Sequence, residues 1–346
     1  MIRIGIICPS EIAFRRFLPA LELCKEFEYI GVAVANSEEW YGEKAPADIS
    51  KEQDSVLNAE FIKAQKFKDK YGGIIFESYS ALINSPDVDA IYIPLPPALH
   101  YKWAKKALEN GKHVLVEKPS TTNAKQTNEL ISIAKEKKLA LHENYMFVFH
   151  KQLEEITNII SANELGDVRL YRIDFGFPKR PEGDFRYIGE LGGGALLDCG
   201  GYTVKYASKL LGEDSYIKCA DLNYVQEYDV DLYGSATLKN PNGEVAQVSF
   251  GMDNEYKCDL EVWGSKGRLL SGRVLTAPAD LEPSCILKIG GNEKIIKLSS
   301  DNSFEKSILF FGECIKSEDI RMQEYRDMKK QAELVEMLRE KANERN

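Results

Sequence analysis

Short apolar runs alternate with amphipathic helical stretches over the first 145 or so residues, and this alternation constrains the fold more than any other feature. Each run is strand-sized, and the stretches between carry apolar residues at three- and four-residue spacing. Strands that alternate with helices form a doubly wound parallel sheet. The predicted strands are 2–7, 29–35, 73–76, 90–94, 113–117 and 140–142, and the predicted helices are 11–27, 58–71, 99–109 and 123–137.

The pattern changes after Lys151. One helix to about Ser161, a strand over 168–176 and a helix over about 194–211 come first, and a helix over 323–341 closes the chain. Between the last two of these helices, runs that alternate apolar and polar residues predict an open antiparallel sheet with one solvent-exposed face. These runs are 216–224, 232–238, 244–250, 258–263, 286–289 and 294–298, with a turn at 240–243.

We therefore predict two domains: an α/β Rossmann domain with a doubly wound parallel sheet over 1–145, and an α+β domain with a large open, mostly antiparallel sheet over 146–346. A chain of 346 residues suits two such domains. The formal net charge of −9 gives no reason to bind nucleic acid or anionic lipid. No segment is long and apolar enough to span a membrane, no leader is evident, and seven scattered cysteines without a C-x-x-C pair indicate reduced thiols. We expect a cytoplasmic protein.

The connection between the first strand and the first helix is where a dinucleotide pyrophosphate would meet backbone amides. It reads Cys8-Pro9-Ser10-Glu11-Ile12-Ala13, so two glycines of the usual G-x-G-x-x-G/A pattern are replaced by Cys8 and Ser10. Ser10 is small, and its hydroxyl can hydrogen-bond a phosphate. We predict cofactor contacts for residues 8–12, although an ordinary strand-to-helix turn explains these residues equally well.

The end of the second strand, where a carboxylate would pair with a ribose 2′-hydroxyl, carries Asn36 and Ser37 instead. We therefore predict that these two residues contact the cofactor and that NADP(H) is favoured, with NAD(H) as the alternative. Arg15 or Arg16 is a candidate for a 2′-phosphate contact, and a solvated helix face is the competing explanation.

Four longer segments resemble the glucose-fructose oxidoreductase, inositol dehydrogenase and rhizopine-catabolism (Gfo/Idh/MocA) family. They are DAIYIPLPPALHYKWAKKALENGKHVLVEKP at 89–119, ENYMFVFH at 143–150, FRYIGELGGGALLDCGGY at 185–202 and LEVWGSKGRL at 260–269. Residues 12–21, Tyr202 and FGMDN at 250–254 most resemble the nucleotide-sugar ketoreductase branch.

The resemblance implies a Rossmann domain followed by a substrate-binding domain whose open sheet forms homodimers or homotetramers. It places the catalytic lysine at Lys118, within Glu117-Lys118-Pro119, and cofactor contacts at Glu117, Lys118, the loop Pro94-Leu95-Pro96 and His100. Lys118 also follows a predicted strand, where ligands of a doubly wound sheet bind.

Asp198 and Tyr202 are four residues apart on a predicted helix and would share a face. Many family members carry histidine where this chain has Tyr202, and polyol dehydrogenases often carry aspartate where it has Lys205. A core aromatic residue is the competing explanation for Tyr202.

Reduction of a ketone leaves negative charge on its oxygen, so a proton donor or a cation is needed there. We predict that Tyr202 gives the proton, Lys118 stabilises the oxyanion and Asp198 holds the lysine, with Lys118 as the alternative acid. Tyr145 and Arg186 are candidate substrate contacts. Packing competes for Tyr145, and an ion pair with Glu190 competes for Arg186. The four histidines show no ligand pattern, so we predict no catalytic metal.

The sequence therefore predicts an NAD(P)-dependent oxidoreductase that acts on CH–OH groups, most concretely a reductase of a keto-sugar or nucleotide sugar. A dehydrogenase of a free sugar or polyol is the alternative enzyme. A catalytically silent cofactor-binding sensor or scaffold is the alternative of another class.

Overall fold

The computed structural model describes residues 1–42 and 55–344. The chain divides into two compact units. Unit 1 comprises Met1–Thr121, Lys125–Asn144 and Ser307–Met328, and unit 2 comprises Thr122–Ala124, Tyr145–Lys306 and Lys329–Asn346. In the part of the chain that is described, no helix is both long and apolar enough to cross a membrane.

Unit 1 is built on a six-stranded sheet in the order β3-β2-β1-β4-β5-β6, with all neighbours parallel. This order, with the reversal beside β1, is that of a doubly wound sheet, and it confirms the predicted Rossmann fold. The strands are β1 (Ile2–Ile7), β2 (Phe27–Ala33), β3 (Ile74–Phe76), β4 (Ala90–Ile93), β5 (His113–Val116) and β6 (Leu141–Glu143).

Helices cover both faces of this sheet, and β4 shows why, because its residues alternate between two sets of partners. Ile91 and Ile93 belong to a buried cluster with Trp103, whereas Tyr92 stacks on Phe17 with ring centroids 3.8 Å apart. The helices of unit 1 are η1 (Ala13–Phe17), α1 (Leu18–Leu21), α2 (Ser37–Tyr41), α3 (Ser55–Tyr71), α4 (Tyr79–Asn84), α5 (Pro97–Glu109), α6 (Ala124–Glu136), α9 (Ser303–Lys316) and the first part of α10 (Glu318–Asn343).

The predicted strands of this unit all occur, with boundaries that differ by at most two residues. The first helix was predicted too long, since helical structure ends at Leu21 and β2 begins at Phe27. Two short helices, α2 and α4, were missed. Each begins at a local cap, because Asn36 accepts from the Glu39 amide and Ser78 accepts from the Ala81 amide.

Unit 2 holds an eight-stranded sheet in the order β14-β13-β12-β11-β7-β10-β9-β8. Only β7 and β10 pair in parallel, so the sheet is mostly antiparallel, as predicted. The strands are β7 (Val168–Gly176), β8 (Tyr216–Tyr224), β9 (Asp231–Lys239), β10 (Val245–Gly251), β11 (Lys257–Gly264), β12 (Gly267–Gly272), β13 (Ser284–Ile289) and β14 (Asn292–Lys297).

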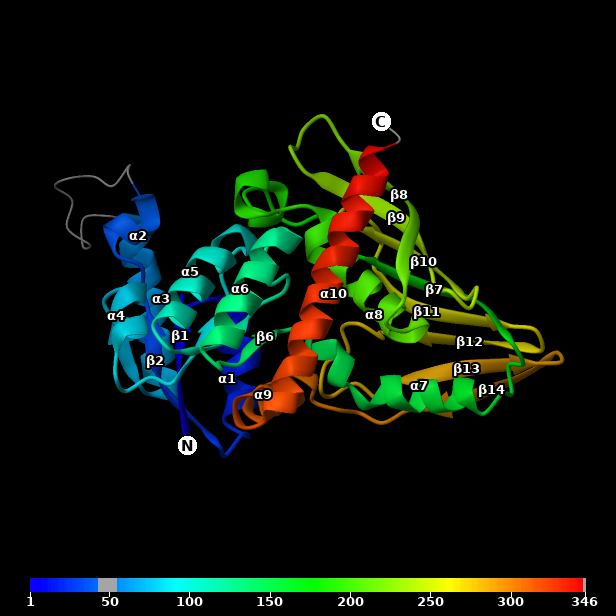
Figure 1. The fold of residues 1–346 in the computed structure, drawn as a ribbon, viewed down its shortest axis with the longest axis horizontal. Coiled ribbons are helices and arrows are strands. Elements are labelled where there is room, and N and C mark those ends of the chain that lie inside the picture. Colours follow the sequence, from blue (N-terminus) through cyan, green and yellow to red (C-terminus); the bar gives the residue numbers. More distant parts are fainter. Residues whose placement is uncertain (43–54, 345–346) are drawn as a thin grey trace. The chain divides into compact units, whose positions relative to one another are not determined.

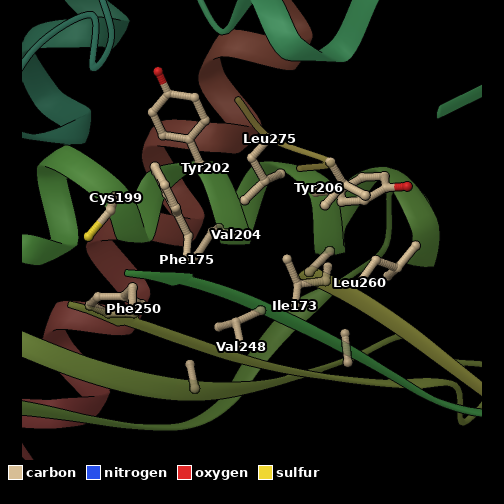
Figure 2. Packing of buried hydrophobic residues seen from close by; sticks show 14 of the residues in the cluster. Ile173, Phe175, Cys199, Tyr202, Val204, Tyr206, Val248, Phe250, Leu260 and Leu275 are labelled. Atoms are coloured by element: carbon tan, nitrogen blue, oxygen red, sulfur yellow. The ribbon is translucent and has the colours of Figure 1, made fainter. Parts of the chain in front are cut away.

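One face of this sheet is covered by α7 (Lys151–Ser161), α8 (Gly201–Leu211) and the last part of α10 (Figure 1). Their apolar side chains and the inward residues of the strands form one continuous core, part of which is seen in Figure 2. The remaining short helices are η3 (Met146–Phe149), η4 (Phe185–Tyr187), η5 (Gly189–Leu191) and η6 (Leu196–Gly200).

Two elements of the C-terminal half escaped prediction, the strand β12 and the helix α9. The C-terminal residues Ser307–Met328 also pack with the Rossmann unit, whereas the predicted division assigned all of 146–346 to the second domain. Their apolar side chains explain this placement, since Tyr325 and Met328 join the cluster that contains Trp103.

Candidate active site

The turn after β1 presents features that suit an anion. Cys8 adopts a left-handed conformation with φ of 72°, which places it in the backbone geometry that a glycine usually supplies. The Ser10 hydroxyl accepts from the Ala13 amide at 3.2 Å and keeps its own proton for donation. The amides of Glu11 and Ile12, in the first helical turn, have no hydrogen-bond partner among residues 1–42 and 55–344. Hydroxyl and amide donors of this kind fit the pyrophosphate of a dinucleotide.

Near the end of β2, the Glu39 carboxylate is committed to other partners, while Glu38 beside it is exposed. Glu39, which follows Asn36 and Ser37, uses both of its carboxylate oxygens to accept from the amides of Tyr79 and Ser80, each at 2.9 Å. This carboxylate caps α4 and is therefore not available as an acceptor for a ribose 2′-hydroxyl. The donor and acceptor set here fits NADP(H) better than NAD(H).

The loops after β4 and β5 are joined by His100, which lies fully buried in α5. Its Nδ1 is 2.8 Å from the carbonyl oxygen of Pro119, and its Nε2 is 2.6 Å from that of Leu95. Burial lowers the pKa of His100 to about 4, helped by the positive charge of Lys118 and opposed by the two carbonyl contacts. Of the other residues predicted in this loop, Pro94 is buried and Pro96 is half-buried.

Glu117 and Lys118 directly follow β5, and the Lys118-Pro119 peptide bond is cis. Tyr92 Oη and Asn144 Nδ2 both donate to Glu117 Oε1, at 2.7 Å and 2.6 Å. Burial raises the pKa of Glu117, while both hydrogen bonds and the positive charge of Lys118 act in the opposite direction. The carboxylate beside Lys118 is therefore fixed by two donors, one in β4 and one directly after β6.

Tyr202 lies in the first turn of α8, just after two glycines that let the helix approach its neighbours. A Cβ on Gly200 would stand 3.1 Å from the Phe250 ring, and a Cβ on Gly201 would stand 2.2 Å from Tyr145 Oη. The motif Gly200-Gly201-Tyr202 thus reflects close packing of this helix start against an aromatic wall.

Three aromatic rings surround Tyr202: Tyr145, Phe147 and Phe175, with centroids 5.2, 5.5 and 5.4 Å away. Figure 2 shows the Tyr202 ring at the edge of the apolar cluster, with its hydroxyl oxygen directed away from the strands that carry Ile173 and Val248. The ring is thus packed like a core residue while its hydroxyl is turned out of the core. The two explanations that the sequence offered, core packing and chemistry, are compatible.

Asp198, one turn before Tyr202, accepts from Arg186 Nε at 2.7 Å. The same guanidinium donates through NH1 to Asp184 at 3.0 Å. These two carboxylates raise the pKa of Arg186 against the effect of its burial. The competing ion pair with Glu190 is wrong, since the described ion-pair partners of Arg186 are Asp184 and Asp198.

Tyr145 is almost fully buried. Gln331 Nε2 donates to its hydroxyl at 3.4 Å and to the Gly201 carbonyl at 2.8 Å. Lys205 Nζ lies 6.0 Å from the centre of its ring. These contacts make Tyr145 a support for the first turn of α8.

Within unit 1 the structure groups the predicted residues at the ends of β1, β2, β4 and β5, and within unit 2 it groups Asp198, Tyr202, Arg186 and Tyr145. Sequence reasoning missed Asn144 and Asp184, which hold Glu117 and Arg186. Asn144 follows the last parallel strand directly, and this position was a usable signal. Over the residues described, no cluster of three or more His, Cys, Asp or Glu side chains could hold a metal ion.

Comparison with known proteins identifies the family. A family model described as an oxidoreductase family with an NAD-binding Rossmann fold (GFO_IDH_MocA) matches residues 27–145, and one for the GFO/IDH/MocA C-terminal domain matches 153–270. The chain belongs to the Gfo/Idh/MocA oxidoreductase family. The family expected from the sequence is thereby confirmed.

Full-length relatives in the Gfo/Idh/MocA family include two dTDP-3,4-didehydro-2,6-dideoxy-alpha-D-glucose 3-reductases. The protein from Actinomadura kijaniata is 35% identical over 98% of this chain and 95% of its own. The protein from Streptomyces violaceoruber is 37% identical over 91% of this chain and 85% of its own. Among solved structures, the A. kijaniata 3-ketoreductase KijD10 with NADP and TDP-benzene has a TM-score of 0.86 at 35% identity, covering 98% of this chain and 97% of that one.

Proposed function

We propose that this protein uses NADPH to reduce the keto group of a nucleotide sugar, with a dTDP-linked 3-keto-deoxysugar as the first substrate to test. The observation that carries the proposal is the similarity, over nearly the whole chain, to several dTDP-3,4-didehydro-2,6-dideoxy-alpha-D-glucose 3-reductases. The solved relative that binds NADP and TDP-benzene supports both halves of the proposal.

The first role concerns the cofactor. The turn at Cys8–Ile12 would hold the pyrophosphate, Asn36 and Ser37 would lie at the ribose, and the loops at Pro94–Pro96 and Glu117–Lys118 would flank the nicotinamide. Bound NADPH supplies the hydride. The commitment of Glu39 to the α4 amides supports the choice of NADPH over NADH.

The second role concerns the proton. As the carbonyl carbon receives the hydride, its oxygen becomes an alkoxide, and the Tyr202 hydroxyl gives that oxygen a proton. Lys118 places its ammonium where this negative charge develops and favours the phenolate that Tyr202 becomes. Solvent then returns a proton to Tyr202. Solved structures of the A. kijaniata enzyme include variants of one lysine and of one tyrosine, the residue types assigned here.

The third role concerns Asp198 and Arg186. Asp198 holds one side of the Arg186 guanidinium and, in this proposal, also helps to keep Lys118 charged. Arg186 lies in the short helix η4 and is available to bind a substrate oxygen through its remaining N–H groups. Because two carboxylates already balance its charge, we assign it a substrate hydroxyl or carbonyl in preference to a phosphate.

We further propose that the protein is a homodimer or homotetramer in which the uncovered face of the eight-stranded sheet is the interface. That face bears exposed aromatic side chains, Tyr233 and Trp263, beside cross-strand ion pairs such as Arg172 with Glu261. Aromatic and arginine side chains are enriched in interfaces. Light scattering on the eluting protein tests this, and a monomer would reject it. We place the reaction in the cytoplasm, where seven cysteines without a disulfide are expected.

The substrate proposal is tested by following NADPH oxidation with dTDP-3,4-didehydro-2,6-dideoxyglucose, with a free keto-sugar and with no sugar. We expect turnover that depends on the nucleotide sugar and is faster with NADPH than with NADH. Turnover of the free sugar alone would favour the free-sugar or polyol enzyme. NADPH binding without any turnover would favour the silent sensor.

A further inference from the structure

A chain of hydrogen-bonded polar side chains, all buried except the partly exposed Glu117, runs from the C-terminal helices to the carboxylate beside Lys118 within unit 1. It consists of Glu324 in α10, His142 in β6, Ser307 in α9, Asn144 after β6 and Glu117 after β5. His142, Asn144 and Ser307 are at most 1% exposed, and Glu324 is 7% exposed. Buried polar groups that form a connected network are costly unless every member is satisfied, so such a network calls for a role.

The first link fixes the amide of Asn144. Its Nδ2 lies 2.6 Å from Glu117 Oε1, and only an N–H can face a carboxylate oxygen that also accepts from Tyr92. Its Oδ1 therefore faces Ser307 Oγ, at 2.7 Å. An amide oxygen only accepts, so the Ser307 hydroxyl gives its single proton to Asn144.

The second link fixes the imidazole of His142. Because the Ser307 proton is already used, His142 Nε2, at 2.9 Å from Ser307 Oγ, must be the donor. His142 Nδ1 then faces Glu324 Oε1 at 2.8 Å, and one proton is shared between them. The Glu143 amide donates to the same oxygen at 3.3 Å. The three hydrogen bonds donated by His142 Nε2, Ser307 Oγ and Asn144 Nδ2 therefore all point towards Glu117.

We infer that Ser307, His142 and Glu324 are positioning residues, which orient Asn144 and through it the Glu117 carboxylate that neighbours Lys118. The inference rests on the proposed function, in which Lys118 acts on the substrate carbonyl. Glu117 and Lys118 interact electrostatically. A Glu117 carboxylate that is held in a single orientation therefore favours a single location of the Lys118 ammonium. Displacement of a catalytic group by about 1 Å can cost about 100-fold in rate.

The decisive variant is Ser307→Ala, which removes both central hydrogen bonds without adding bulk. We expect kcat for NADPH-dependent reduction of the dTDP-keto-sugar to fall about 10- to 100-fold, with KM for NADPH changed less than about twofold. Ser307→Thr keeps the hydroxyl and should restore most of kcat. Ile308→Ala, at the next position of α9 and equally buried, should lower thermal stability and leave kcat nearly unchanged.

A readout independent of activity is the ¹⁵N spectrum of the protein labelled in its four histidines. The signals of His142 are assigned by their loss in His142→Gln. We expect a protonated Nε2 and a proton shared at Nδ1, and a changed Nδ1 signal in Glu324→Gln. An unprotonated Nε2, or wild-type kcat in Ser307→Ala, would overturn the inference. A wild-type protein without turnover would instead contradict the proposed function, and the histidine spectrum would still decide the proton arrangement.

Discussion

Arg186 Nε and Asp198 Oδ2 are 2.7 Å apart, with side chains that are only 25% and 12% exposed. The aspartate expected to hold Lys118 thus has a cationic partner within its own unit. Asp198 lies in η6, which continues directly into α8, and Arg186 lies in η4, so the pair joins η4 to the helix turn that precedes Tyr202.

This pair should be energetically coupled. Removing one member leaves the other charge partly buried, and we expect a coupling free energy of about 1–3 kcal/mol between Arg186→Gln and Asp198→Asn. Urea unfolding of the two single variants and the double variant measures it. Asp184→Asn serves as the comparison, because Asp184 holds the same guanidinium without belonging to the helix. Additive losses would contradict the assignment.

Gly201 should tolerate no side chain while Tyr145 keeps its hydroxyl. Since the new Cβ would stand 2.2 Å from Tyr145 Oη, we expect Gly201→Ala to destabilise the protein by about 1–3 kcal/mol. Tyr145→Phe removes the clashing atom and should recover part of this loss in the double variant. Gly272→Ala, whose Cβ would meet only Asp259 at 3.5 Å, is the matched control for thermal unfolding.

His113 should make stability depend on pH below neutrality. Its Nδ1 accepts from the Ala140 amide at 2.9 Å, and burial together with the charge of Arg321 lowers its pKa to about 4. The unfolded chain takes up a proton near pH 6.5, so the folded state is favoured above that pH and loses stability as the pH falls towards 4. This one group should contribute a loss of about 2 kcal/mol by pH 5.

The measurement for His113 is the free energy of unfolding between pH 7 and 5. His113→Asn keeps an acceptor near the position of Nδ1 and cannot be protonated in this range, so its stability should fall less steeply than that of the wild type. Equal slopes for the two proteins would show that His113 does not carry the effect.

The fold could be predicted where periodicity is long and local. The six parallel strands, and the first and last residues of β7 and β8, could be predicted from apolar runs bounded by turns. The missed helix α9 lies just before the closing helix, and its apolar residues were not recognised as a separate element. Its role is visible only in three dimensions, because Ser307 bonds to a residue more than 160 positions earlier.

The candidate site could be predicted in part, because some of its residues lie in short, local sequence motifs. Lys118, Asp198 and Tyr202 stand in motifs that resemble those of a known family, so single positions could be named. The partners of those residues could not, since Arg186 with Asp184, and Glu117 with Asn144, are brought together by turns and strand pairing. His142 was set aside for lack of ligand spacing, and its hydrogen bonds to α9 and α10 have no local signal.

The measurement that tests the account most directly is the turnover number of Lys118→Met, Tyr202→Phe and the double variant, with NADPH and the dTDP-keto-sugar. Tyr202→Phe keeps the ring that packs against Tyr145, Phe147 and Phe175, so its fold should be retained. We predict that each single change lowers kcat about 100- to 10,000-fold while NADPH still binds, and that the double variant is hardly slower than the worse single one. Wild-type turnover in both single variants would contradict the assignment of Lys118 and Tyr202 to the reaction.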